Sequence, residues 1–201
     1  MWPLALRLEA AGFRTARVGY PSRMLTVDQS VALVGRKIAV AARGWAWIDL
    51  VGHSLGGIIA RRVAEDFAEL PIRRIVQLGS PNAGSPVAGQ LNRNRLAREF
   101  FGPVLEEIAT LDPGRGRSRG VGAIAGTIAQ GASIPVAGLQ GPSDGLVEIG
   151  SALSGAEQEM VVPAAHGWLP LSATVSQQVI SFLTDGSFKE DREREDVSDN
   201  T

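Results

Sequence analysis

The stretch that decides the fold runs from Ile48 to Ala60 and reads IDLVGHSLGGIIA. Its first half is an apolar run of strand length, and its second half opens a helical pattern. Between the two halves, Ser54 is framed by Gly52 and Gly56. A serine at such a turn is held in a strained backbone conformation that points its hydroxyl outward, and small neighbours two residues away avoid a collision. The stretch therefore predicts a nucleophile elbow.

The helix after the turn is expected to contribute an oxyanion donor as well as to shape the turn. Its amide dipoles point back at the turn, and the backbone N–H of Leu55 is placed to bind the oxyanion that forms when Ser54 attacks an ester. A bare Gly-x-Ser-x-Gly pattern also occurs by chance. Here it stands in the strand-turn-helix context that an activated serine requires, which favours the catalytic interpretation.

Alternating strand and helix patterns surround this stretch. Expected helices span residues 4–11, 27–42, 58–70, 91–101, 104–111 and 171–183, and expected strands span 13–20, 45–51, 72–78, 121–128 and 160–162. Strands that alternate with helices at this spacing imply crossover connections. The predicted fold class is therefore α/β, with a mostly parallel sheet and helices on both of its faces.

Length and composition predict one domain. A chain of 201 residues with 44% hydrophobic residues can bury one good core. We place this domain at residues 1–188 and interpret 81–120, where the strand-helix pattern loosens, as an excursion from the sheet in the place of a cap or lid. Residues 189–201 are mostly charged and polar and predict a disordered tail.

Charge and cysteine content exclude several classes of function. The 20 basic and 21 acidic residues give a formal charge of −1, so no overall field favours nucleic acid or an anionic membrane. The short basic loop with Arg115, Arg117 and Arg119 is better explained as a solvated loop than as a nucleic-acid site. The absence of cysteine excludes disulfides, thiolate metal sites and a cysteine nucleophile.

The first residues and the longest uncharged segment of the sequence bear on its cellular location. The first residues lack the basic lead and long apolar core of a signal peptide, so a cytoplasmic location is expected. Residues 120–143 carry no charge, but glycines and prolines interrupt them, and we interpret them as strand and loop. Membrane association and oligomeric state are left open by the sequence.

Only two histidines are available as a base for Ser54. Serine needs a neighbouring base to take its proton, and histidine suits that task near neutral pH. His53 belongs to the elbow itself, and its side chain is expected to point away from the serine. His166 lies in a loop after the last expected strand and before the last helix, so we predict that His166 is the base.

A carboxylate must orient the imidazole of the base. In chain order the acid falls between the serine and the histidine in this type of site. Asp144, in a Ser-Asp-Gly turn that follows an expected strand, is our first choice. Asp112 is the main competitor, although its Asp-Pro-Gly context is typical of a helix-ending turn, and Glu148 is the second.

Four segments together resemble the bacterial lipase and esterase branch of the α/β-hydrolases. They are GHSLGG at 52–57, LGSPNAGS at 78–85, SDGLV at 143–147 and His166, in the order of that family. The resemblance covers the chain to about residue 188. It implies an α/β-hydrolase fold, no cofactor, and small-molecule or lipid carboxylic esters as substrates. The residue roles that it implies are Ser54 as nucleophile, Asp144 as acid, His166 as base, Leu55 as oxyanion donor, and Phe100, Phe101 and Leu105 as lining of an acyl pocket.

The sequence departs from that family at its start. Members usually begin with a strand that ends in a His-Gly type loop, which supplies a second oxyanion donor, and this sequence starts inside the helix that follows. Loss of one such donor costs about 100- to 1,000-fold in turnover. We therefore expect a weakened enzyme or an incomplete chain with an exposed sheet edge. A silent relic that binds a partner through the same cleft, or an acyltransferase, remains an alternative.

Overall fold

A parallel sheet of four strands forms the centre of the computed structural model, which describes residues 1–93, 95, 102–109, 120–129, 139 and 141–189. All three strand pairings are parallel, so the carboxyl ends of the strands meet at one edge of the sheet. The strands, in their order across the sheet, are β1 (Ile48–His53), β2 (Ile72–Leu78), β3 (Val121–Gly126) and β4 (Gln158–Val162). The predicted α/β class is confirmed.

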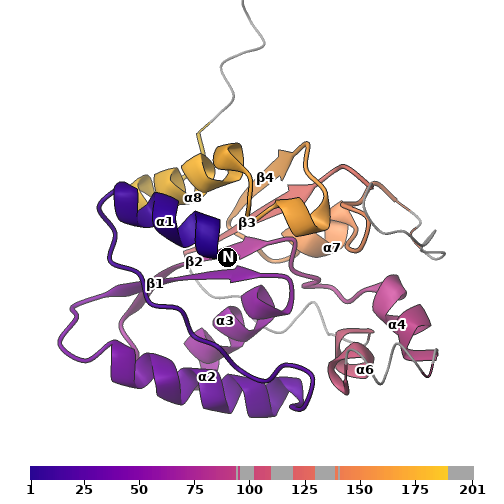
Figure 1. The fold of residues 1–201 in the computed structure, drawn as a ribbon, viewed down its shortest axis with the longest axis horizontal. Coiled ribbons are helices and arrows are strands. Elements are labelled where there is room, and N and C mark those ends of the chain that lie inside the picture. The colour runs from indigo at the N-terminus through magenta and orange to yellow at the C-terminus, as the bar shows by residue number, and fades with distance from the viewer. Residues whose placement is uncertain (94, 96–101, 110–119, 130–138, 140, 190–201) are drawn as a thin grey trace, which may run out of the picture.

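Helices cover both faces of the sheet (Figure 1). One face carries α1 (Trp2–Ala10) and α8 (Ala173–Asp185), and the other carries α2 (Val27–Ala41) and α3 (Leu55–Asp66). The shorter elements are α4 (Pro86–Arg93), α6 (Val104–Ala109), α7 (Ile149–Leu153) and the 3₁₀ turn η1 (His166–Trp168). The sequence pattern predicted α1, α2, α3, α6 and α8 but not α7 or η1. The helix predicted at 91–101 overlaps only the last residues of α4, and most of it lies outside the described residues.

Side chains of the sheet alternate between two apolar cores, as the pleat of a strand requires. On β2, Val76 and Leu78 pack with α1 and α8, whereas Ile75 faces α3. The core under α2 and α3 is closed by apolar residues of these helices and of α4 and α6. β3 is buried along its whole length, which explains why its sequence lacks polar side chains.

The predicted strand at residues 13–20 is wrong. The structure has no strand there, and β1 forms the outer edge of the sheet among the described residues. A strand exists only where a neighbour completes its hydrogen-bond ladder, and no described segment pairs with this one. Its apolar residues are explained by packing instead, because Phe13 contacts one core while Val18 and Tyr20 contact the other.

The excursion after β2 returns to the body of the protein through α4 and α6. These two helices lie against each other (Figure 1), and their apolar residues join the core of α2 and α3. A hydrogen bond of 2.9 Å from the backbone N–H of Val27 to the Glu107 carboxylate ties α6 to the start of α2. No described helix is both long enough and apolar enough to cross a bilayer.

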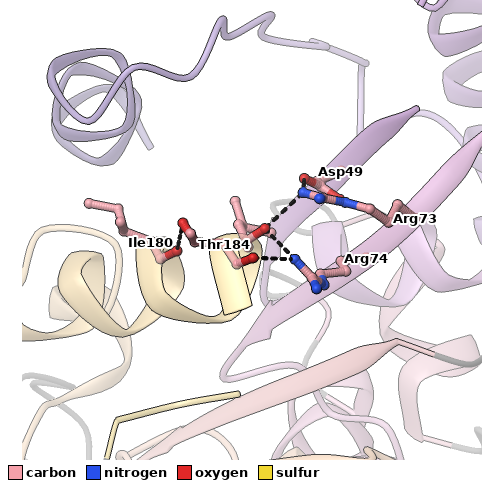
Figure 2. A network of polar contacts seen from close by, with 6 residues as sticks. Asp49, Arg73, Arg74, Ile180 and Thr184 are labelled. Atoms are coloured by element: carbon pink, nitrogen blue, oxygen red, sulfur yellow. Dashed lines mark hydrogen bonds and ion pairs between the residues drawn. The ribbon is translucent and has the colours of Figure 1, made fainter. Parts of the chain in front are cut away.

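Arginines on β2 clamp the end of α8 at the edge opposite the carboxyl ends of the strands (Figure 2). Arg73 donates to both oxygens of the Asp49 carboxylate, at 3.0 and 2.6 Å, and also to the main-chain oxygen of Leu183. Arg74 donates to the carbonyls of Leu183 and Thr184. The last carbonyls of a helix lack donor partners within it, so the guanidinium N–H groups of these arginines satisfy them.

Replacement of Asp49 with asparagine should destabilise the fold by about 1 to 3 kcal/mol, because it removes the charge of a two-pronged ion pair. The side chain of Asp49 is only 6% exposed, so water cannot replace the lost partner well. Asp28→Asn is the matched control, since the Asp28 side chain is 79% exposed in its ion pair with Arg62. The control should lose less than about 1 kcal/mol in urea unfolding. Equal losses in both variants would contradict the buried role of Asp49.

Candidate active site

Ser54 sits at a strained turn between β1 and α3. Its φ of 55° and ψ of −127° make it the single non-glycine with positive φ among the described residues. Such a conformation costs about 1 to 3 kcal/mol and persists only where surrounding structure enforces it. The residue occupies the N-cap of α3 without making the side-chain bond that capping serines usually make. Its hydroxyl is therefore not used by the helix.

The elbow geometry corrects one expectation about its glycines. A Cβ at Gly52 would lie 2.3 Å from the Gly56 carbonyl oxygen, which confirms the need for glycine there. A Cβ at Gly56 would meet nothing within 4 Å, so the expected requirement for a small residue at this position is wrong. The crowded position is Gly57, whose Cβ would lie 2.0 Å from the Ser80 hydroxyl. The close approach is between the third residue of α3 and the chain after β2.

Asp144 and His166 form a buried pair at the carboxyl edge of the sheet. Nδ1 of His166 lies 2.8 Å from Oδ2 of Asp144, and their side chains are 10% and 1% exposed. The other carboxylate oxygen accepts the backbone N–H groups of Leu146 and Val147 at 3.0 and 2.8 Å. The backbone N–H of His166 also donates to the Asp144 carbonyl, at 2.9 Å. Backbone amides and imidazole together satisfy a carboxylate that is removed from water.

The two halves of the site meet across the end of β2. The backbone N–H of Ser54 donates to the Leu78 carbonyl at 2.9 Å. The next residue, Gly79, has a φ of 56°, and a Cβ there would lie 2.9 Å from Asp144 Oδ2 and 3.2 Å from His166 Nδ1. Only a glycine leaves room for the pair so close to the elbow. Among the described residues, no hydrogen bond joins the Ser54 hydroxyl to His166.

His53 links the elbow to the His166 loop. Its Nε2 lies 3.0 Å from the main-chain oxygen of His166, and the centroids of the two rings are 4.7 Å apart. Burial, followed by the nearby charge of His166, lowers the pKa of His53 to about 4. The sequence predicted only that this side chain points away from Ser54, and its contact with the other histidine depends on tertiary packing.

The remaining candidates from the sequence fall elsewhere. Glu148 is the N-cap of α7, while Asp144 is the carboxylate that reaches His166. Leu55 is the first residue of α3, where a backbone N–H has no acceptor within the helix. Leu105 is buried in the core of α2 and α3. Asp112, Phe100 and Phe101 lie outside the described residues, as do the three arginines of the basic loop.

A buried polar network, which was not predicted from the sequence, lies behind the elbow. Gln77, fully buried on β2, donates to the Gly57 carbonyl at 3.0 Å and to the Asn82 side chain at 2.8 Å. Asn82 in turn donates to the Ala152 carbonyl in α7 at 2.9 Å. The sequence signal for this network was Gln77, a polar residue at a buried position of a strand, which needs hydrogen-bond partners. The network fixes the chain after β2 against both α3 and α7.

Comparisons with known proteins identify the fold. The family described as "PGAP1-like alpha/beta domain" matches residues 27–100. No curated protein matches the sequence. The mature form of the Bacillus licheniformis lipase BlEst2 has a similar structure, with a TM-score of 0.70 and 17% identity over 90% of this chain and 82% of the lipase. Phospholipase PlaB from Legionella pneumophila, in complex with thio-NAD, gives a TM-score of 0.56 and 23% identity over 74% of this chain and 40% of the phospholipase. The chain has the α/β-hydrolase fold.

Two neighbouring glycines of α3 provide a matched test of the elbow packing. Gly57→Ala should destabilise the protein by about 1 to 3 kcal/mol, because its Cβ would overlap the Ser80 hydroxyl. Gly56→Ala adds the same methyl group where space is open, and it should change the unfolding free energy by less than about 1 kcal/mol. Urea unfolding of both variants measures the difference. A Gly56→Ala variant that is the less stable of the two would contradict the packing described here.

The stability of the protein should fall on acidification through His53. The pKa of His53 is lowered to about 4 in the folded chain from 6.5, by burial first and then by the charge of His166, with Asp144 and the N-terminal amine also acting on it. Between these values the unfolded chain binds a proton at His53 that the folded chain does not bind. Lowering the pH from about 6.5 to about 4 should therefore cost up to about 3 kcal/mol of unfolding free energy through His53, which causes no further loss below that pH.

Urea unfolding at several pH values measures this loss, with His53→Gln as the control. The variant keeps every other titrating group and lacks this one, so its stability should fall less steeply over the same interval. Parallel curves for the two proteins would show that His53 does not have a lowered pKa.

Proposed function

We propose that this protein is a serine hydrolase that cleaves carboxylic esters through an acyl-enzyme on Ser54. The observation that carries the proposal is the buried Asp144–His166 pair, joined at 2.8 Å, beside a serine held at a strained turn. A strained residue with an unused hydroxyl, next to an oriented imidazole, is the arrangement that nucleophilic catalysis requires. A purely structural turn would need neither the strain nor the buried carboxylate.

In the first half of the proposed reaction, Ser54 attacks the ester carbonyl. Nε2 of His166 takes the hydroxyl proton. Nδ1–H of the same ring keeps donating to the Asp144 carboxylate, which orients the ring and stabilises its positive charge. The backbone N–H of Leu55 donates to the oxyanion of the tetrahedral intermediate. His166 then gives its proton to the leaving alcohol, and the acyl group remains on Ser54.

In the second half, water replaces the alcohol. His166 takes a proton from the water as it attacks the acyl carbonyl, and the same oxyanion site binds the second intermediate. Collapse of that intermediate breaks the bond to Ser54, whose oxygen recovers the proton from His166. The complete reaction consumes one ester and one water and releases one acid and one alcohol. Every catalytic group in it is a residue of the chain.

The surroundings of the elbow favour esters with an apolar acyl group. Leu55 packs against the core that α4 and α6 share with α2 and α3, so the side of the elbow toward these helices is apolar. An acyl chain that enters from this side would leave water without losing hydrogen bonds. Lipid esters and small apolar esters are therefore the proposed substrates, in keeping with the lipase and phospholipase that share the fold.

A fluorophosphonate probe tests the proposal, because it bonds to activated serines. We expect labelling at Ser54, mapped by mass spectrometry, and none in Ser54→Ala or His166→Ala. Hydrolysis of p-nitrophenyl butyrate should fall by at least about 1,000-fold in both variants. Ser154→Ala is the control, since this partly buried serine follows α7 and lies outside the proposed machinery.

Thermal unfolding should show that all three variants remain folded. Turnover that survives either Ser54→Ala or His166→Ala would overturn the assignment of that residue. A folded wild type that neither labels nor hydrolyses esters would instead favour a silent member of this fold that binds a partner at the same edge of the sheet.

A further inference from the structure

The side chain of His53 contacts the segment that carries His166. His53 is the last residue of β1 and immediately precedes Ser54. Its Nε2 is 3.0 Å from the main-chain oxygen of His166, and the two rings are tilted by 43° at a centroid distance of 4.7 Å. The residue next to the proposed nucleophile therefore holds the main chain of the proposed base.

The acceptor fixes the protonation of His53. A carbonyl oxygen can only accept, so Nε2 of His53 must carry the hydrogen. Burial lowers the pKa of His53 to about 4, so near neutral pH the ring is uncharged, with Nδ1 bare. A neutral donor places no positive charge beside His166, which must itself become positive when it takes the serine proton.

The other contacts of His166 hold it to a different part of the fold. Its backbone N–H and its Nδ1 both bond to Asp144, at 2.9 and 2.8 Å. These bonds set the position of His166 relative to the loop that contains Asp144, which lies between β3 and α7. The bond from His53 instead sets it relative to β1, and hence relative to Ser54.

We propose that His53 is a positioning residue, which holds the main chain of His166 at the separation from Ser54 that proton transfer requires. The inference rests on the proposed function, because it assigns His53 a part in that same reaction. Misplacement of a reacting group by about 1 Å can cost about 100-fold in rate. A bond that joins the neighbour of the nucleophile directly to the base is suited to prevent such a displacement.

The test compares two replacements of His53. His53→Phe keeps a ring against His166 but has no donor, whereas His53→Gln offers an amide N–H at similar reach. We expect His53→Phe to lower the second-order rate of fluorophosphonate labelling at Ser54, and kcat for p-nitrophenyl butyrate, by about 10- to 100-fold, with KM changed less than about 3-fold. His53→Gln should recover most of this loss. Equal rates in the two variants would overturn the proposal, because the donor would then be irrelevant.

A measurement on the wild type keeps the proposal testable even if His53→Phe does not fold. The chain has two histidines, so a ¹⁵N-histidine NMR spectrum contains two ring systems, and His53→Gln assigns them. At pH 7 we expect the neutral Nε2–H tautomer for His53. The Nδ1–H tautomer, or a charged ring, would overturn the hydrogen bond on which the proposal depends.

Failure of the proposed function would be distinguishable from failure of this inference. A wild type that does not label at Ser54 contradicts the proposed function, whatever the tautomer of His53. A wild type that labels, and loses labelling in His166→Ala but not in His53→Phe, keeps the function and contradicts the positioning role.

Discussion

The strained turn at Ser54 is the constraint on which the rest of the structure depends. A non-glycine residue keeps a positive φ only if its neighbours leave it no alternative. Here β1 is held in register with β2, the backbone N–H of Ser54 is bonded to the Leu78 carbonyl, and α3 begins at the next residue. Gly52 and Gly57 allow the strand and the helix to approach closely enough. The cost of the turn is offset by packing across the whole centre of the sheet.

Once the turn is fixed, the loops after the neighbouring strands have little freedom. The chain after β2 must pass between the elbow and the Asp144–His166 pair, and Gly79 is the residue that fits. Asp144 can be buried because both of its carboxylate oxygens have donors. These residues come from loops that follow β2, β3 and β4, and parallel pairing is what brings the ends of those strands to one edge.

The edge of the sheet formed by the amino ends of the strands holds α8 in place. There the Asp49–Arg73 pair and Arg74 attach the end of α8 to the start of the strands, where no candidate catalytic residue lies. A rigid attachment at one edge leaves the other edge free to carry residues whose positions matter for chemistry. His53 connects the sheet to the site, because it belongs to strand β1 and its side chain bonds to the loop that carries His166.

The sequence by itself determined the elements whose signals are local. Helical and strand periodicity predicted most of the helices and all four strands, and the strand-turn-helix context identified Ser54. Chain order and turn chemistry selected Asp144, and His166 was the histidine left after His53 was assigned to the elbow. The fold places Nδ1 of His166 2.8 Å from Oδ2 of Asp144. The strand and helix predictions succeeded because each depends on residues a few positions apart, whose spacing is visible in the chain. The catalytic roles of Ser54, Asp144 and His166 stay predictions.

Only the tertiary structure decided which segments have partners and which side chains meet. Residues 13–20 have the pattern of a strand but no ladder neighbour among the described residues, so they form none. The crowded glycine of α3 is Gly57 rather than Gly56, because the atom it would strike belongs to Ser80. His53 reaches a carbonyl 113 positions along the chain. Periodicity reports the environment of neighbours in sequence, whereas hydrogen-bond partners and steric contacts are set by how distant segments are packed together.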